Sequence, residues 1–150
     1  MNNIMNSSES GNALQVFSYN GAKVRTVEKN GEIWFVAKDV CSILGLTNTA
    51  EALRGLNAKD LTSAILTSGG QNREMNCINE PGVYKLIFKS RKPEAEKFQD
   101  WVTSEVLPAI RKHGMYISDK NLDAFKDNPE AFNLLLEKYT KEHDKRIALQ

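Results

Sequence analysis

The chain has 150 residues, of which 41% are hydrophobic and 26% are charged, and its formal net charge is +1. These values are typical of a soluble globular domain that is long enough to bury a core. A net charge so close to zero excludes a protein that attracts a polyanion with its whole surface, so an electrostatic partner has to bind a local patch. No run of residues approaches the roughly 18 apolar positions that a membrane helix needs.

The two cysteines and the first residues point to a reducing compartment. Cys41 and Cys77 are far apart, and no C-x-x-C pair or Cys/His cluster surrounds them. This pattern predicts buried free thiols and no zinc site. The opening stretch MNNIMNSSESGN has neither the cationic nor the apolar region of a secretion signal. We expect a disordered lead over residues 1–13 and a cytoplasmic location.

Short β-strands are expected in two places. Residues 15–27 favour a hairpin around Asn20-Gly21, and a second turn at 29–32 leads into a strand over 33–36. Residues 62–67 and 74–78 are predicted to be strands joined by a loop of about six residues. Ser68-Gly69-Gly70 lacks the Lys-Ser/Thr and the helix entry of a P-loop, so a flexible turn is the better interpretation.

Two short helices are predicted between these strands. Ala37, Val40, Cys41 and Leu44 repeat at helical spacing, and Gly45 suits the left-handed residue after a helix end. Residues 50–56 form the second helix, with Asn48 or Thr49 as its N-cap. Such a pair resembles a helix-turn-helix, which can read DNA. Ordinary helical packing is the competing interpretation, because the second helix is short and carries one cation.

A local basic face is the feature of the region after residue 79. Asn79 is expected to cap a helix whose apolar face contains Val83, Leu86 and Ile87, and a longer helix follows from Pro93 until Gly114, kinked or divided at Pro108. Lysines recur on another face at i, i+4 and i+7. Phosphate contact and a merely solvated face are both open interpretations. The candidate nucleic-acid-binding residues are Lys85, Lys89, Arg91, Lys92, Arg111 and Lys112.

The C-terminal part is expected to be a linker followed by a helix. Residues 118–128 are polar, and residues 129–150 have a rough apolar stripe. An isolated helix with such a stripe needs a partner. We therefore predict a homo-oligomer, a dimer or a higher form. The candidate oligomerisation residues are Phe132, Leu135, Leu136, Tyr139 and Ile147.

Residues suited to catalysis are sparse. His113 and His143 have no adjacent nucleophile, and the carboxylates lack a D-x-D spacing. No glycine-rich dinucleotide fingerprint follows a strand. We expect no enzyme, no cofactor and no metal site.

Motifs spread along most of the chain resemble those of the Bro-N domain family, named for the baculovirus repeated open reading frames and common in phage and prophage antirepressors. The similarity covers roughly residues 14–117. In chain order the motifs are WFVAKDVC at 34–41 with Leu44-Gly45, SGG at 68–70, INE at 78–80 with GVYKLI at 82–87, SRKP at 90–93, Phe98, WV at 101–102, EVLP at 105–108, IR at 110–111 and GMY at 114–116.

The resemblance implies an α+β fold in which small antiparallel β-strands and hairpins pack with several short helices and one longer helix, followed by a C-terminal helical segment. Trp34, Phe35, Phe98 and Trp101 are interpreted as core aromatics. The domain boundaries expected are 14–117 for the Bro-N domain, 118–128 for the linker and 129–150 for the C-terminal helix.

The resemblance also implies a regulator of the lysis/lysogeny switch that binds DNA through its Bro-N domain. The alternative is an antirepressor that sequesters a cognate phage repressor protein without contacting DNA. Family members often carry a separate C-terminal domain, and this chain is expected to be a short form or a piece of one.

Overall fold

The computed structural model of the chain describes residues 23–149. The chain divides into two compact units, Met1–Glu105 and Val106–Gln150. The turn predicted at Asn20-Gly21 and the lead predicted over residues 1–13 lie outside the described residues.

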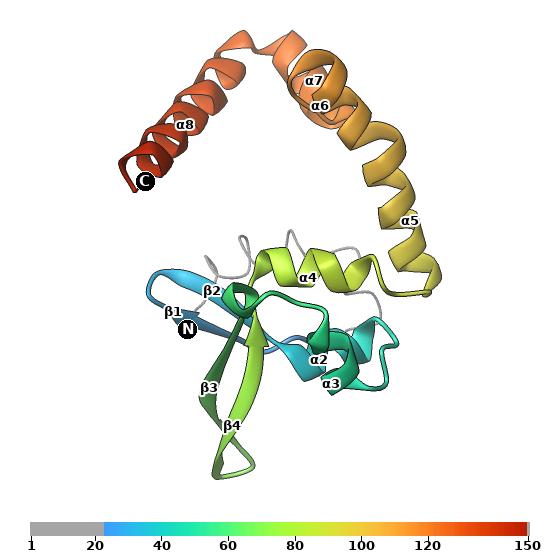
Figure 1. Ribbon diagram of the computed structural model, residues 1–150. Helices are drawn as coiled ribbons and strands as arrows, with labels where there is room; N and C mark the ends of the chain where they lie inside the picture. The colour runs from blue at the N-terminus through green and yellow to red at the C-terminus, as the bar shows by residue number, and fades with distance from the viewer. Residues whose placement is uncertain (1–22, 150) are drawn as a thin grey trace. The chain divides into compact units, whose positions relative to one another are not determined.

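A four-stranded antiparallel sheet forms the first unit together with its helices (Figure 1). The strands are β1 (Thr26–Lys29), β2 (Glu32–Val36), β3 (Leu61–Ser68) and β4 (Gln71–Ile78), in the order β1-β2-β4-β3. Asn30 and Gly31 connect β1 to β2 with positive φ values of 55° and 80°. The predicted α+β class is thus confirmed, and so is the turn before β2.

The connection between β3 and β4 differs from the prediction. Gly69 and Gly70 form a two-residue turn with φ values of 61° and 81°, and Ser68 already pairs with Gln71. The predicted six-residue loop was therefore wrong. Two adjacent glycines adopt positive φ without steric cost, so the strands continue up to them despite the polar residues of β4.

The helical pair between β2 and β3 forms as predicted. Helix α2 (Ala37–Ile43) ends with Gly45 at φ 71°, where the Gly45 and Leu46 amides donate to the carbonyls of Ser42 and Cys41. This is a Schellman C-cap. Helix α3 (Thr49–Arg54) follows, and the Asn48 side chain accepts from the Glu51 amide, so Asn48 is the N-cap. A 3₁₀ turn (Ala58–Asp60) then leads to β3.

The next helices also begin where the sequence indicates. Helix α4 (Glu80–Ile87) is capped by Asn79, which accepts from the Gly82 amide at 2.9 Å. Helix α5 (Pro93–Trp101) passes into a π-helical turn (Val102–Val106), which is followed by helix α6 (Leu107–His113). Pro108 thus divides the long helix, since a proline ring clashes with the preceding turn and a wider π-turn makes room for it. Gly114 ends α6 at φ 80°.

The core of the first unit has two parts. The larger lies between the sheet and the helices, and Phe35, Leu44, Ile78, Leu86 and Ile87 are fully buried in it. The smaller surrounds Trp34, Val36 and Cys77 on the other face of the sheet. Phe98 packs partly buried against the larger core, but Trp101 is 41% exposed. The core interpretation was therefore wrong for Trp101.

The second unit consists of α6, α7 (Asp119–Asp127) and α8 (Pro129–Ala148). The expected linker at 118–128 is instead mostly helix α7, because Ser118 caps it and accepts from the Asn121 amide. Helix α8 confirms the predicted C-terminal helix. None of residues 106–149 is buried. Among the described residues, no helix has both the length and the apolar character to cross a membrane.

Candidate nucleic-acid interface

Helix α4 and the loop after it carry four of the predicted cations in the first unit. Val83, Leu86 and Ile87 are fully buried, so the helix is held by one face. Two hydrogen bonds to neighbouring segments fix the loop. The Ser90 hydroxyl donates to the Leu44 carbonyl at 2.6 Å, and the Gln99 side-chain amide donates to the Ile87 carbonyl at 2.7 Å. The cations at 89, 91 and 92 are therefore presented by a rigid segment.

Lys85 is engaged inside the fold. Its Nζ lies 2.6 Å from Oδ2 of Asp60, which is 1% exposed. Nδ2 of Asn79 donates to the other carboxylate oxygen of Asp60 at 3.1 Å. The hydrogen bond from Lys85 holds the pKa of Asp60 below its ordinary value, against the opposing effect of burial. Lys85 thus neutralises a buried acid, which the spacing of the lysines did not reveal.

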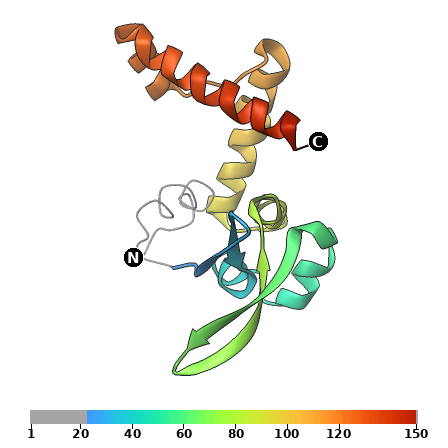
Figure 2. The ribbon, with the colours of Figure 1, turned by 90° about the vertical axis from the view of Figure 1, so that its left-hand side faces the viewer.

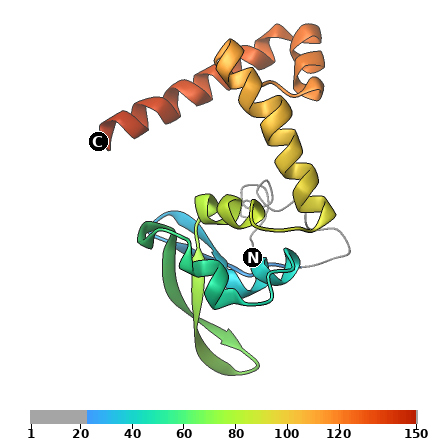
Figure 3. The same cartoon turned by 45° about the vertical axis from the view of Figure 1, so that its right-hand side comes forward.

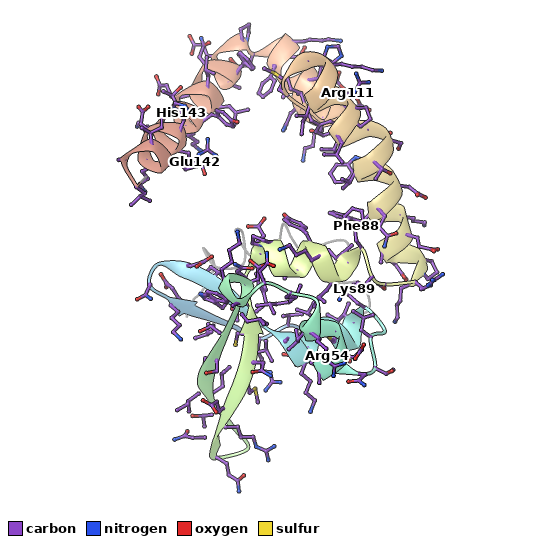
Figure 4. The ribbon with its side chains drawn as sticks, in the orientation of Figure 1. Arg54, Phe88, Lys89, Arg111, Glu142 and His143 are labelled. Atoms are coloured by element: carbon purple, nitrogen blue, oxygen red, sulfur yellow. The ribbon has the colours of Figure 1, made fainter. Side chains whose placement is uncertain are left out.

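Lys89, labelled in Figure 4, and Lys92 connect the loop after α4 to the helical pair. Nζ of Lys89 donates to the Ala52 carbonyl at 3.1 Å, near the C-terminal end of α3. A Cβ added at Gly55 would lie 2.5 Å from that Nζ, so this glycine makes room for the lysine. The stem of Lys92 lies against Gly45, where an added Cβ would lie 3.2 Å from Cε. Sequence reasoning missed both contacts, since they join segments far apart in the chain.

Of the four predicted cations in the first unit, three have no acidic partner among the described residues. Within residues 23–149, no salt bridge involves Lys89, Arg91 or Lys92. Arg54, at the end of α3, forms an exposed ion pair with Glu51. Lys89, Arg91 and Lys92, termed the basic cluster, therefore keep their positive charge available to an external anion.

A shallow depression lies beside α3. Its volume is about 470 Å³, and it is lined by Ala50, Leu53, Arg54, Leu61, Thr62 and Asn76. Its walls come from α3 and from the first residues of β3 and the last of β4. Arg54 and Lys89 both lie near the end of α3. The depression therefore lies between this end of α3, close to the basic cluster, and the β3–β4 hairpin.

Arg111 and Lys112 lie on α6, in the second unit. These two predicted cations therefore belong to a different compact unit from the basic cluster. The predicted oligomerisation residues all lie on α8. Leu135, Leu136, Tyr139 and Ile147 are exposed, and Phe132 contacts Phe125 of α7 edge-on at 5.3 Å between ring centroids.

Residues suited to other chemistry are scattered. Cys41 and Cys77 are buried and unpaired, and burial raises the pKa of both thiols. His143 is exposed beside Asp144 on α8. In the part of the chain that the structure describes, no three His, Cys, Asp or Glu side chains are grouped to hold a metal ion.

Comparison with known families decides the identity of this arrangement. Residues 23–108 match the model of Bro-N, the N-terminal domain of the BRO family. The chain belongs to the Bro-N family. The match begins just before β1 and ends in α6, so it contains the sheet, α2 to α5 and the basic cluster.

Relatives of this Bro-N protein come from viruses and from a bacterium. An uncharacterized protein of Haemophilus influenzae is 45% identical over 105 residues, covering 69% of this chain and 52% of that protein. The putative Bro-N domain-containing protein 201R of Invertebrate iridescent virus 6 is 35% identical over 138 residues, covering 78% of this chain and 32% of that protein. The chain thus spans about half or less of these relatives. No solved structure matches it.

Proposed function

We propose that this Bro-N protein is a non-enzymatic regulator, encoded by a virus or prophage, that binds DNA through the basic cluster. The observation that carries the proposal is the set of three cations, Lys89, Arg91 and Lys92, on a rigid loop and without acidic partners among the described residues. Phosphate oxygens are the natural ligands of such a cluster, and each neutralised phosphate releases a counterion. Lys85, Arg111 and Lys112 stay as candidates, but the cluster does not depend on them.

The biological role that we propose is that of an antirepressor in a lysis/lysogeny switch. Membership of the Bro-N family supports this role, because relatives of the chain include viral proteins. An alternative is that the protein sequesters a repressor without touching DNA. The near-neutral charge and the many exposed apolar side chains of the second unit favour a protein partner.

We also propose that the protein forms a homo-oligomer through α8. None of residues 106–149 is buried, so packing within this unit contributes little stability. The charges of α8 are divided along its length. Glu130 and Glu137 are its charged residues before position 138, while from there on Lys138, Lys141, Lys145 and Arg146 outnumber Glu142 and Asp144. An antiparallel pair of α8 helices would oppose the acidic and the basic parts and bury the apolar stripe.

The two functions are separated by one pair of measurements. A gel shift with double-stranded DNA at increasing salt is run beside a pull-down with the cognate phage repressor. DNA binding that weakens steeply with salt supports the phosphate contacts of the basic cluster. Repressor capture with no shift at low salt would instead establish the protein-binding alternative.

A further inference from the structure

The β3–β4 hairpin extends well beyond the sheet. Strand β2 pairs with β4 only at Cys77 and Ile78, so residues 63–76 form a two-stranded ribbon without a third strand. Figures 1 to 3 show this ribbon projecting from the first unit in every view. Six residue pairs at about 3.4 Å each give it a length of roughly 20 Å.

The two faces of the ribbon differ in character. Ala64, Leu66 and Met75 pack partly buried against the cluster around Trp34. The opposite face, termed the polar ribbon face, is exposed throughout. It consists of Ser63, Ile65, Thr67, Asn72, Glu74 and Asn76. A ribbon that is covered on one face is held rigidly while the other face stays open to a partner.

The polar ribbon face keeps hydrogen-bonding groups available. Oδ1 of Asn72 accepts from the Thr67 hydroxyl at 2.8 Å, and Asn72 Nδ2 makes no hydrogen bond within the described residues. The Asn76 amide likewise has no side-chain partner in the described residues, and it lines the depression with Arg54. Asparagine amides pair with adenine edges, and carboxylates accept from cytosine amino groups. One oxygen of Glu74 accepts from the Ser63 hydroxyl at 3.4 Å, which leaves the other for such a contact.

We propose that this ribbon is the part of the protein that reads DNA sequence, with its polar face directed at base edges in the major groove. The inference rests on the proposed DNA-binding function and names the element that confers sequence preference. The major groove of B-DNA admits a two-stranded β-ribbon, whereas that of A-form RNA is too deep and narrow for side chains to read. The occupant is therefore double-stranded DNA.

A cation at the base of the ribbon suits a flanking phosphate. Arg54 lines the depression there together with Asn76 of the polar ribbon face. Arg73 and Lys29 belong to the other face, since Arg73 pairs with Leu66 and Nζ of Lys29 donates to the Thr62 hydroxyl at 2.9 Å. The ribbon thus continues the surface that begins at the basic cluster and α3, so one duplex can contact both. The cluster then supplies affinity and the ribbon supplies preference.

The test uses the full chain and a random-sequence duplex pool, from which the duplex preferred by the native protein is selected. Binding of that duplex and of a scrambled duplex is then measured for Asn72→Ala with Asn76→Ala. We expect the preference to fall roughly 5- to 150-fold for each base that the variant no longer reads, with binding of the scrambled duplex and its salt slope unchanged. The matched control, Asn121→Ala with Asn133→Ala, changes two exposed amides of the second unit and should keep the full preference.

Other outcomes separate the ribbon from the proposed function. If the native chain binds duplexes without preference, or the ribbon variant retains the preference, the ribbon is not the reader and DNA binding itself stands. If the native chain binds no duplex even at low salt, both ideas fail. A ribbon variant that changes the oligomeric state in light scattering would mean that a second copy occupies the ribbon, which also overturns the proposal.

Discussion

Nζ of Lys85 on α4 lies 2.6 Å from Oδ2 of Asp60, a carboxylate that is 1% exposed and precedes β3. The pair joins α4, the helix that precedes the basic cluster, to the segment between α3 and the ribbon. A buried acid without its cation is unfavourable, because neither water nor an opposite charge compensates it. The contact therefore fixes the distance between the two surfaces that are proposed to touch DNA.

The first prediction concerns this pair. Lys85→Met should lower the melting temperature more than the double change Lys85→Met with Asp60→Asn, because the double change leaves no uncompensated charge. Thermal unfolding at neutral pH measures both. Lys85→Met should leave the salt slope of DNA binding unchanged. Equal melting temperatures of the two variants would show that the carboxylate finds compensation elsewhere, for example from Asn79.

The second prediction concerns acid. The hydrogen bond from Lys85 lowers the pKa of Asp60. Burial raises the pKa of Asp39, but hydrogen bonds from Arg25 outweigh this effect, so that pKa is lowered as well. In both cases the unfolded chain takes up protons at a higher pH than the folded chain. The stability from these groups is thus complete above their ordinary pKa of 3.8 and is lost as pH falls below about 4. Urea unfolding at pH 7, 4 and 3 should show this loss, and Asp39→Asn with Asp60→Asn should flatten it.

Local sequence patterns predicted the ends of the helices but not their long-range partners. Gly45, Asn79 and Gly114 act where expected, because a cap depends on neighbours within a few residues. The Lys85–Asp60 contact spans 25 positions, and periodicity reveals only that a lysine faces outward from its own helix. The ribbon was predicted too short, since Gln, Asn and Arg have weak strand propensity and pair here because the glycine turn sets their register.

The third prediction concerns Trp34, which is 8% exposed and centres the smaller core cluster beneath the ribbon. Trp34→Ala should lower the free energy of unfolding by about 3–5 kcal/mol, as large-to-small core changes do. Denaturant unfolding measures the loss. Phe88→Ala is the control, since that ring is 47% exposed and should cost much less. A Trp34 variant that keeps its stability but loses a partner would identify the indole as a contact residue.

The fourth prediction concerns the basic cluster. Lys89→Gln with Lys92→Gln should reduce the magnitude of the log–log salt slope of DNA binding by about 0.9 for each phosphate that is no longer neutralised. The reduction should be similar for all duplex sequences, because phosphate contacts position the protein without specifying a base. Gel-shift titrations across a range of salt concentrations measure the slope.

Two further variants make this measurement selective. Lys89 also donates to the Ala52 carbonyl, so its loss can disturb α3 as well as remove a charge. Arg91→Gln avoids this difficulty, since no hydrogen bond of the Arg91 side chain is found within residues 23–149. This variant should reduce the magnitude of the salt slope by the amount expected for a single phosphate. Lys120→Gln with Lys126→Gln removes two charges from α7 and should leave the slope unchanged. If the native chain, the cluster variants and the α7 control all show the same salt slope, the basic cluster does not contact DNA phosphates.

The last prediction concerns α8. Its 20 residues make a helix of about 30 Å. Its exposed apolar side chains are Leu134, Leu135, Leu136, Tyr139 and Ile147. Light scattering should find the full chain larger than a monomer and a version ending at Tyr116 monomeric. If the helices pair antiparallel, Glu130→Lys should weaken association, and adding Arg146→Glu should restore it, because opposite charges then meet again. If the full chain and the version ending at Tyr116 are both monomers, α8 does not mediate self-association. Association unaffected by either charge change would retain the apolar contact but exclude the antiparallel arrangement.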